Sequence, residues 1–155
     1  VPLVARWPGQ IPAGTLVETP AIAYDIFPTF LRLAGGKLPE DRVYDGIDLW
    51  PVLSRTGSIP QERPFVWVYL DDVTALRLGK WKLHVADRDK HLDKPELFDL
   101  DADPGEAHDV AVEHPEVVER MRAIVSEYEA DIPYVWSLHY TVRDPRKRQT
   151  GVRRE

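Results

Sequence analysis

The sequence contains no cysteine among its 155 residues. Disulfide bonds, thiol nucleophiles and cysteine-based zinc sites are therefore excluded. The absence of cysteine does not assign a compartment, because cysteine-free proteins are found both in the cytoplasm and among exported, periplasmic proteins.

Long apolar runs and an excess of basic charge are also missing. No run approaches the ~20 residues that span a bilayer. Acidic residues outnumber basic ones by 26 to 20, a balance that argues against nucleic-acid binding. We therefore expect neither a membrane span nor a nucleic-acid partner. The chain does contain five Trp, six Tyr and four Phe, which supply large apolar surfaces for a core.

The chain opens on an apolar segment rather than on an initiator Met or a signal peptide. Leu3–Trp7 is short and is closed by Pro8-Gly9, a pattern typical of a buried strand that ends in a turn. Because a domain rarely begins inside its own core, we expect an N-terminal truncation. An unpaired apolar strand edge favours association. We therefore expect self-association through this edge, a partner, or weaker order in the first ~60 residues.

Hydrophobic periodicity predicts two main helices. Asp25–Ala34 has an apolar face, with Asp25 as its expected cap and Gly35-Gly36 as its end. Pro115–Ile132 has an apolar stripe on one side and acidic residues on the other, so we expect it to pack on a sheet. Asp48 is expected to cap a short additional helix, Leu49–Leu53.

The middle of the chain predicts strands. Phe65–Leu70 and Glu96–Leu100 are strand candidates, and Ala75–Leu78 with Trp81–Val85 form either one bent strand or a hairpin. Ala86–Pro95 is polar and predicts a loop. Three strand regions followed by a long helix predict an α+β class, with a small antiparallel sheet packed against one long amphipathic helix.

Two local clusters resemble metal sites without meeting their requirements. Asp99-x-Asp101-x-Asp103 is spaced like a calcium loop, but Pro104 stands where glycine is needed and Val110 where the bidentate glutamate is needed. We expect a strand-end turn there. The second cluster is interpreted as exposed loop residues; it consists of His84, Asp87, Asp89 and His91.

Several segments in order resemble the sulfatase family. The sequence Asp25-Ile26-Phe27-Pro28-Thr29-Phe30-Leu31 is similar to the family's D-[IL]-x-P-T-[LF]-L helix. The other segments that carry the resemblance are Val1–Gly9, Leu33–Gly35, Asp45–Leu49, Leu76–Leu83, Glu96–Leu100, Asp103–Glu106 and Asp109-Val110. The resemblance covers nearly the whole chain up to about Ile132.

The resemblance implies the C-terminal part of an alkaline-phosphatase-like α/β fold. Residues 1–59 would be a remnant of the large α/β domain, and residues 60–140 the C-terminal subdomain. Residues 141–155 would be a solvated basic tail. The upstream catalytic domain of the same polypeptide is the implied partner.

The resemblance also implies chemistry that this chain lacks. Sulfatases cleave sulfate esters with a formylglycine made within a [CS]-x-P-x-R motif, assisted by calcium. No serine of the chain is followed by x-Pro-x-Arg, and the metal ligands would lie upstream. We therefore expect no catalytic residue and no metal in this chain, with formylglycine and calcium in the full-length parent.

The site candidates are consequently residues at the rim of the substrate pocket. Asp71 and Asp72 follow a strand and are expected in a solvated loop, or alternatively at the substrate entrance that the subdomain overhangs in this family. Arg77 and Lys82 are expected to pair with acidic groups and tie the subdomain to the large domain; direct contact with an anionic substrate is the alternative.

Two other functions stay open at this level. The first is a phosphonate monoester hydrolase or phosphodiesterase of the same superfamily. The second is a stand-alone, non-catalytic carbohydrate-binding or interaction module, whose sugar-stacking candidates would be Trp50, Trp67 and Trp136.

Overall fold

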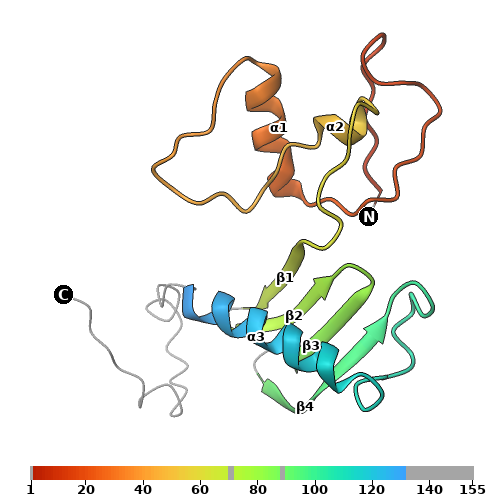
Figure 1. Ribbon diagram of the computed structural model, residues 1–155, viewed down its shortest axis with the longest axis vertical. Helices are drawn as coiled ribbons and strands as arrows, with labels where there is room; N and C mark the ends of the chain where they lie inside the picture. Colours follow the sequence, from red (N-terminus) through yellow and green to blue (C-terminus); the bar gives the residue numbers. More distant parts are fainter. Residues whose placement is uncertain (1, 70–71, 88–89, 132–155) are drawn as a thin grey trace. The chain divides into compact units, whose positions relative to one another are not determined.

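The computed structural model describes residues 2–69, 72–87 and 90–131 of the chain (Figure 1). The chain divides between Arg63 and Pro64 into two compact units. Each unit is described below by itself. Residues 132–140 and the predicted basic tail, residues 141–155, lie outside the described residues.

The first unit contains short helices joined by long loops. A 3-10 turn, Ala23–Asp25, leads directly into helix α1, Ile26–Leu33, and the chain later forms helix α2, Trp50–Leu53. Both expected helices are confirmed. The predicted Asp48 cap is also present, because its Oδ1 accepts a hydrogen bond from the Trp50 N–H at 2.8 Å.

The expected N-terminal strand is wrong. Residues 2–6 have no regular secondary structure, and Val4 is 89% exposed. A strand needs a hydrogen-bonding neighbour, and no other segment among the described residues pairs with this one. The proposed association through a strand edge therefore has no such edge in the described structure.

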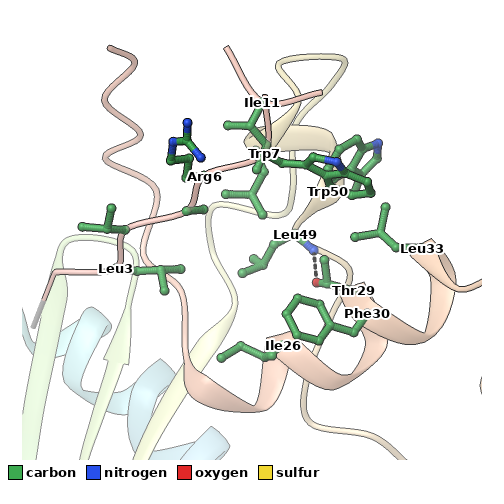
Figure 2. A pocket seen from close by; sticks show the side chains of 13 residues that line it. Leu3, Arg6, Trp7, Ile11, Ile26, Thr29, Phe30, Leu33, Leu49 and Trp50 are labelled. Atoms are coloured by element: carbon green, nitrogen blue, oxygen red, sulfur yellow. Dashed lines mark hydrogen bonds between the residues drawn. The ribbon is translucent and has the colours of Figure 1, made fainter. Parts of the chain in front are cut away.

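The apolar face expected on α1 is also uncovered. Phe27 is 54% exposed and Phe30 is 66% exposed, whereas the buried residues of the helix are Pro28 and Thr29. Phe30 lines an apolar groove of about 550 Å³ between α1 and the N-terminal segment (Figure 2). Apolar surface of this extent usually marks a contact with another part of a protein.

Asp25 is a buried anchor rather than the expected side-chain cap of α1. Its carboxylate accepts hydrogen bonds from the backbone N–H groups of Ile22 at 2.8 Å and Ile47 at 2.9 Å. It also accepts two from the Arg63 guanidinium, at 2.8 and 2.5 Å. One side chain thus joins three segments that are distant in sequence.

Thr29 adds a second buried link beside Asp25. Its hydroxyl donates to the Asp25 carbonyl at 2.6 Å and accepts from the Leu49 N–H at 2.8 Å (Figure 2). Leu49 is itself 3% exposed and immediately precedes α2. The Asp25 and Thr29 side chains therefore hold the 47–49 segment against α1.

The second unit is a four-stranded antiparallel sheet in the order β1-β2-β3-β4. The strands are β1 Pro64–Tyr69, β2 Asp72–Leu78, β3 Trp81–Asp87 and β4 Lys90–Asp99. Leu78 pairs with Trp81 across the Gly79-Lys80 turn, where Gly79 has φ 60°. A positive φ is accessible to glycine at no steric cost, and the hairpin alternative is therefore the one that forms.

The predicted polar loop, Ala86–Pro95, is wrong over much of its length. β4 begins at Lys90, and the backbone pairs Ala86 with His91 and Asp87 with Lys90. β3 and β4 pair along their apolar residues, and the same backbone pairing continues into the polar residues of both strands. Local polarity alone did not reveal this.

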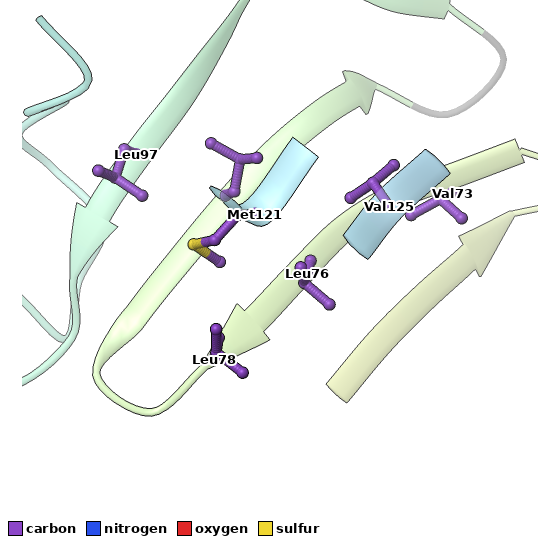
Figure 3. Close-up of a cluster of buried hydrophobic side chains, with 7 residues drawn as sticks. Val73, Leu76, Leu78, Leu97, Met121 and Val125 are labelled. Carbon is purple, nitrogen blue, oxygen red and sulfur yellow. The ribbon is translucent and has the colours of Figure 1, made fainter. Parts of the chain in front are cut away.

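Helix α3, Pro115–Asp131, packs across one face of the sheet (Figure 1). The core between them comprises Val73, Leu76, Leu78, Leu83, Leu97, Met121 and Val125 (Figure 3). The predicted helix and its role in the core are thus confirmed. No helix among the described residues is both long and apolar enough to cross a membrane.

Replacing Met121 with Ala should destabilise the sheet unit. Met121 is fully buried between α3 and the sheet, and comparable truncations cost about 2–5 kcal/mol. Urea unfolding followed by circular dichroism measures the change. Glu127→Ala, at an exposed position of the same helix, is the control and should change stability little. Equal effects of the two substitutions would contradict the proposed core.

Replacing Asp25 with Asn should destabilise the first unit by about 3–5 kcal/mol, because it leaves the Arg63 charge buried without its carboxylate. Burial raises the pKa of Asp25, but hydrogen bonds from Arg63, Ile22 and Ile47 outweigh it and lower the pKa overall. The carboxylate therefore stabilises the fold above its unfolded pKa, and this contribution is lost as pH falls through the folded pKa.

Thermal unfolding between neutral and acidic pH tests this expectation. Asp41→Asn is the control, because the Asp41–Arg42 pair at 2.7 Å is exposed and such pairs contribute little. An Asp25→Asn variant as stable as the control would refute the anchor.

Candidate functional site

The face of the sheet away from the core carries a polar and aromatic groove. In the β2–β3 ladder, Leu76 pairs with Leu83 on the core side, while the next pair along, Ala75 with His84, faces the other way. A groove of about 280 Å³ lies on this second face. It is lined by Trp67, Tyr69, Thr74, Ala75, Lys82, His84 and Ala86.

Glu106 connects the two basic side chains of the groove. Its carboxylate accepts a hydrogen bond from Lys82 Nζ at 2.6 Å and lies 2.7 Å from His84 Nε2. Burial raises the pKa of Glu106, but the hydrogen bonds from Lys82 and His84 outweigh it and lower the pKa overall. Glu106 therefore stays ionised and holds both side chains in fixed positions.

The turn before Glu106 sets the position of its carboxylate. The Asp103 side chain accepts hydrogen bonds from the N–H groups of Ala107 at 2.7 Å and His108 at 2.9 Å. Within this turn Glu106 itself has a positive φ of 54°. A non-glycine residue in this region costs conformational energy, which the two side-chain contacts of Glu106 offset.

Trp67 and Tyr69 form the aromatic edge of the groove. They are 45% and 48% exposed. The Lys82 ammonium lies over the Trp67 ring, 5.2 Å from its centroid, which is within the range of a cation–π contact. The groove thus combines exposed rings with hydrogen-bond donors that Glu106 has already positioned.

The structure separates the predicted rim residues. Asp71 lies outside the described residues. Asp72 begins β2 and pairs with Tyr69 at the end of the groove. Arg77 lies five residues further along the strand, about 17 Å away by strand geometry; its Nε donates to the Gly79 carbonyl at 2.9 Å. Asp72 is therefore adjacent to the groove, and Arg77 supports the hairpin turn.

Sequence reasoning misplaced His84 of the groove and did not single out Glu106 beside it. His84 is on β3, so its interpretation as an exposed loop residue is wrong; the side chains of Asp87, Asp89 and His91 lie outside the described residues. Glu106 was named only as part of the segment Asp103–Glu106 that carries the family resemblance. The sequence did contain a signal for this groove. A spacing of two residues places Trp67 and Tyr69 on one face of a strand, and likewise Lys82 and His84 on one face of another. Lys82 does pair with an acid, as expected, within the sheet unit.

The part of the chain that the structure describes offers no grouping of ligands for a calcium ion. Among the described ranges, no three His, Asp or Glu side chains gather to hold a metal ion. Asp99 instead accepts from Lys80 Nζ at 2.5 Å and from the Asp101 N–H at 3.1 Å, which confirms the predicted strand-end turn. Ser58-Ile59-Pro60 matches the first half of the formylglycine motif, but Glu62 stands where arginine is required.

Comparison with curated proteins relates this chain to one group of hydrolases. It is 33% identical to bovine (Bos taurus) arylsulfatase A over 86% of the chain, and 32% identical to rat (Rattus norvegicus) steryl-sulfatase over 85%. The N-acetylgalactosamine-6-sulfatase of the dog (Canis lupus familiaris) is 29% identical over 83%. The chain belongs to the sulfatase family. It spans 32%, 28% and 30%, respectively, of these relatives' own lengths. No protein-family model matches it.

Solved structures agree with this assignment. Ps i-CgsB in complex with k-i-k-neocarrahexaose has a TM-score of 0.67 at 26% identity and covers 81% of this chain and 28% of that chain. A 2-O GAG sulfatase has a TM-score of 0.53 at 24% identity, over 81% of this chain and 28% of its own, and supports the fold alone. The α+β, alkaline-phosphatase-like fold expected from the sequence is confirmed for this sulfatase-family chain.

Replacing Glu106 with Gln should weaken the sheet unit by about 1–3 kcal/mol, since two hydrogen bonds to a charged acceptor lose that charge. The pKa of Glu106 is lowered in the fold. Its contribution is therefore present above the unfolded carboxyl pKa and disappears as pH falls through the folded value. Urea unfolding at neutral and acidic pH measures the loss.

Glu96→Gln is the matched control for this substitution. Glu96 is exposed on β4 and pairs in register with His84. The control should leave unfolding nearly unchanged, and a Glu106→Gln variant that behaves like it would show that the three-residue contact contributes nothing.

Proposed function

We propose that this chain is the C-terminal portion of a sulfuric ester hydrolase. In this role it completes the fold and rims the substrate pocket without supplying the catalytic groups. The observation that carries the proposal is the coverage: most of the chain aligns with arylsulfatase A, but it spans only 32% of that protein. The relatives described above are sulfatases, which favours a sulfate ester over a phosphonate or phosphodiester substrate.

The two units take different parts in this proposal. Residues 1–59 belong to the large α/β domain, residues 60–140 form the smaller subdomain, and residues 141–155 are a basic tail. The apolar groove of the first unit supports this division, because Trp7, Phe30 and Trp50 line a surface that needs a covering partner (Figure 2). The upstream catalytic domain of the same polypeptide supplies that partner.

The subdomain contributes to the substrate pocket rather than to bond cleavage. Asp71, Asp72 and Arg77 remain the proposed rim residues, and the groove beside Asp72 extends this rim. Formylglycine and calcium would belong to the upstream part, where formylglycine would supply the nucleophile and calcium would stabilise charge on the sulfate oxygens. The residues of this chain orient the substrate.

Assays of two polypeptides test the proposal. The 155-residue chain with added calcium should not hydrolyse p-nitrophenyl sulfate. The same chain extended upstream through a [CS]-x-P-x-R motif, with that Cys or Ser converted to formylglycine, should do so. Turnover by the short chain, or an extended polypeptide that prefers a phosphonate ester, would overturn the assignment. Sequencing the region upstream of Val1 establishes whether such a motif exists.

A further inference from the structure

We propose that the outer edge of β1 pairs with the same strand of a second copy of this chain. The two strands run antiparallel and join two four-stranded sheets into one. The contact uses β1, Pro64–Tyr69, and not the N-terminal segment Leu3–Trp7, which forms no strand. The inference goes beyond the proposed function and does not depend on it.

The two edges of the sheet differ in how they are covered. β1 and β4 are the outer strands (Figure 1). The edge of β4 is covered, because the Leu97 carbonyl accepts a hydrogen bond from the Val110 N–H and the Leu97 N–H donates to Asp109 Oδ1, both at 2.9 Å. No strand in the described part of the chain lies beside the outer edge of β1. An uncovered strand edge is a template for pairing with another chain.

The sequence of β1 contains none of the features that usually prevent edge pairing. Those features are a charged residue on the strand, an internal proline or a bulge. The strand Pro-Phe-Val-Trp-Val-Tyr carries no charge, and its proline, Pro64, is its first residue. The register shift beside Trp67 skips Thr74, so the bulge belongs to β2 and not to the edge strand. The net charge of −6 on each chain therefore arises outside this contact.

Side chains on both faces of β1 are about half exposed. Trp67 and Tyr69 line the groove on one face, whereas Val68 pairs with the core residue Val73 and points to the other face. The exposed fractions of Trp67, Tyr69 and Val68 are nearly equal, at 45%, 48% and 49%. A ligand on one face covers only the residues of that face, but an added strand contacts side chains on both. The exposure pattern therefore fits a strand beside β1.

Backbone geometry sets the register of the pairing. The Trp67 carbonyl accepts a hydrogen bond from the Thr74 hydroxyl of β2 at 3.2 Å, so Trp67 directs its backbone groups toward β2. Because these directions alternate along an antiparallel strand, Val66 and Val68 direct theirs outward. A two-fold axis at Trp67 pairs Val66 of each copy with Val68 of the other. This register leaves Pro64, which has no N–H, outside the new hydrogen bonds.

A second copy of the chain suits this edge because a two-fold contact is self-complementary. Each copy presents the same uncharged residues, so no like charges meet across the axis. Val66 of one copy lies opposite Val68 of the other, and β-branched pairs of this kind stabilise antiparallel sheets. The Trp67 rings of the two copies meet on one face at the axis, where an aromatic pair adds further contact.

Sedimentation velocity of the 155-residue chain over a range of concentrations tests the inference. We expect a reversible equilibrium between monomer and dimer. Val68→Lys should weaken the dimer about tenfold or more, since it places a charge beside the partner strand. Val112→Lys is the matched control. It adds the same charge at a position that is 93% exposed and outside the sheet, and it should leave the dimer Kd nearly unchanged.

Mixing two variants separates the loss of the contact from the loss of the fold. With the axis at Trp67, the two copies of position 68 are diagonal neighbours on one face of the joined sheet. Val68→Lys and Val68→Glu chains should therefore dimerise weakly alone and form a mixed dimer when combined. A mixture that stays monomeric, or equal effects of Val68→Lys and Val112→Lys on the dimer, would overturn the inference.

Amide hydrogen exchange locates the contact on the chain. The Val66 and Val68 amides should exchange more slowly as the chain concentration rises, because they become hydrogen-bonded only in the dimer. Protection of both amides at every concentration would mean that another segment of the same chain covers the edge, and it would refute the proposal. A dimer in which neither amide gains protection would place the contact elsewhere, on a surface such as the exposed face of α1, and would refute it as well.

Discussion

The buried carboxylate of Asp25 is the interaction on which the first unit depends. Residues 2–63 form only short helices and no sheet, so this part of the unit cannot rely on a continuous backbone ladder. Instead, the Asp25 side chain joins the start of α1, the backbone at Ile47 and the guanidinium of Arg63. A buried charge is tolerated only when such partners surround it, so the three segments must assemble together. Arg63 is also the last residue before the sheet unit, and the network therefore extends to the boundary between the two units.

The sheet unit is organised differently, because one face of its sheet is buried and the other is exposed. One face is covered by α3 and forms a dry core around Leu76, Leu83 and Met121. The other face carries the groove, where Glu106 holds Lys82 and His84. The core supports this second face, and the turn at Asp103 brings Glu106 from outside the sheet onto it.

The family assignment gives these features a common interpretation. Under the proposed function, a chain that spans 30% of a sulfatase relative's length exposes surfaces that the rest of the protein would cover. The exposed apolar face of α1 is such a surface, since aromatic side chains of this size seldom remain in water without a role. The groove differs from it, because Glu106 contacts its Lys82 and His84 side chains while Trp67 and Tyr69 stay nearly half exposed. The apolar face of α1 therefore fits assembly with the rest of the proposed larger protein.

The sequence by itself determined the family, the helices and most of the strands. Periodicity places Met121 and Val125 on the core side of α3, and helical caps and turn residues act over only a few positions. Features that depend on contacts between residues distant in the sequence were decided only by the tertiary structure. The segment Leu3–Trp7 has strand composition but no neighbour to pair with, and β4 extends into polar sequence because β3 lies beside it. Likewise, Glu106 meets His84 across 22 positions, a distance in sequence over which local pattern carries no information.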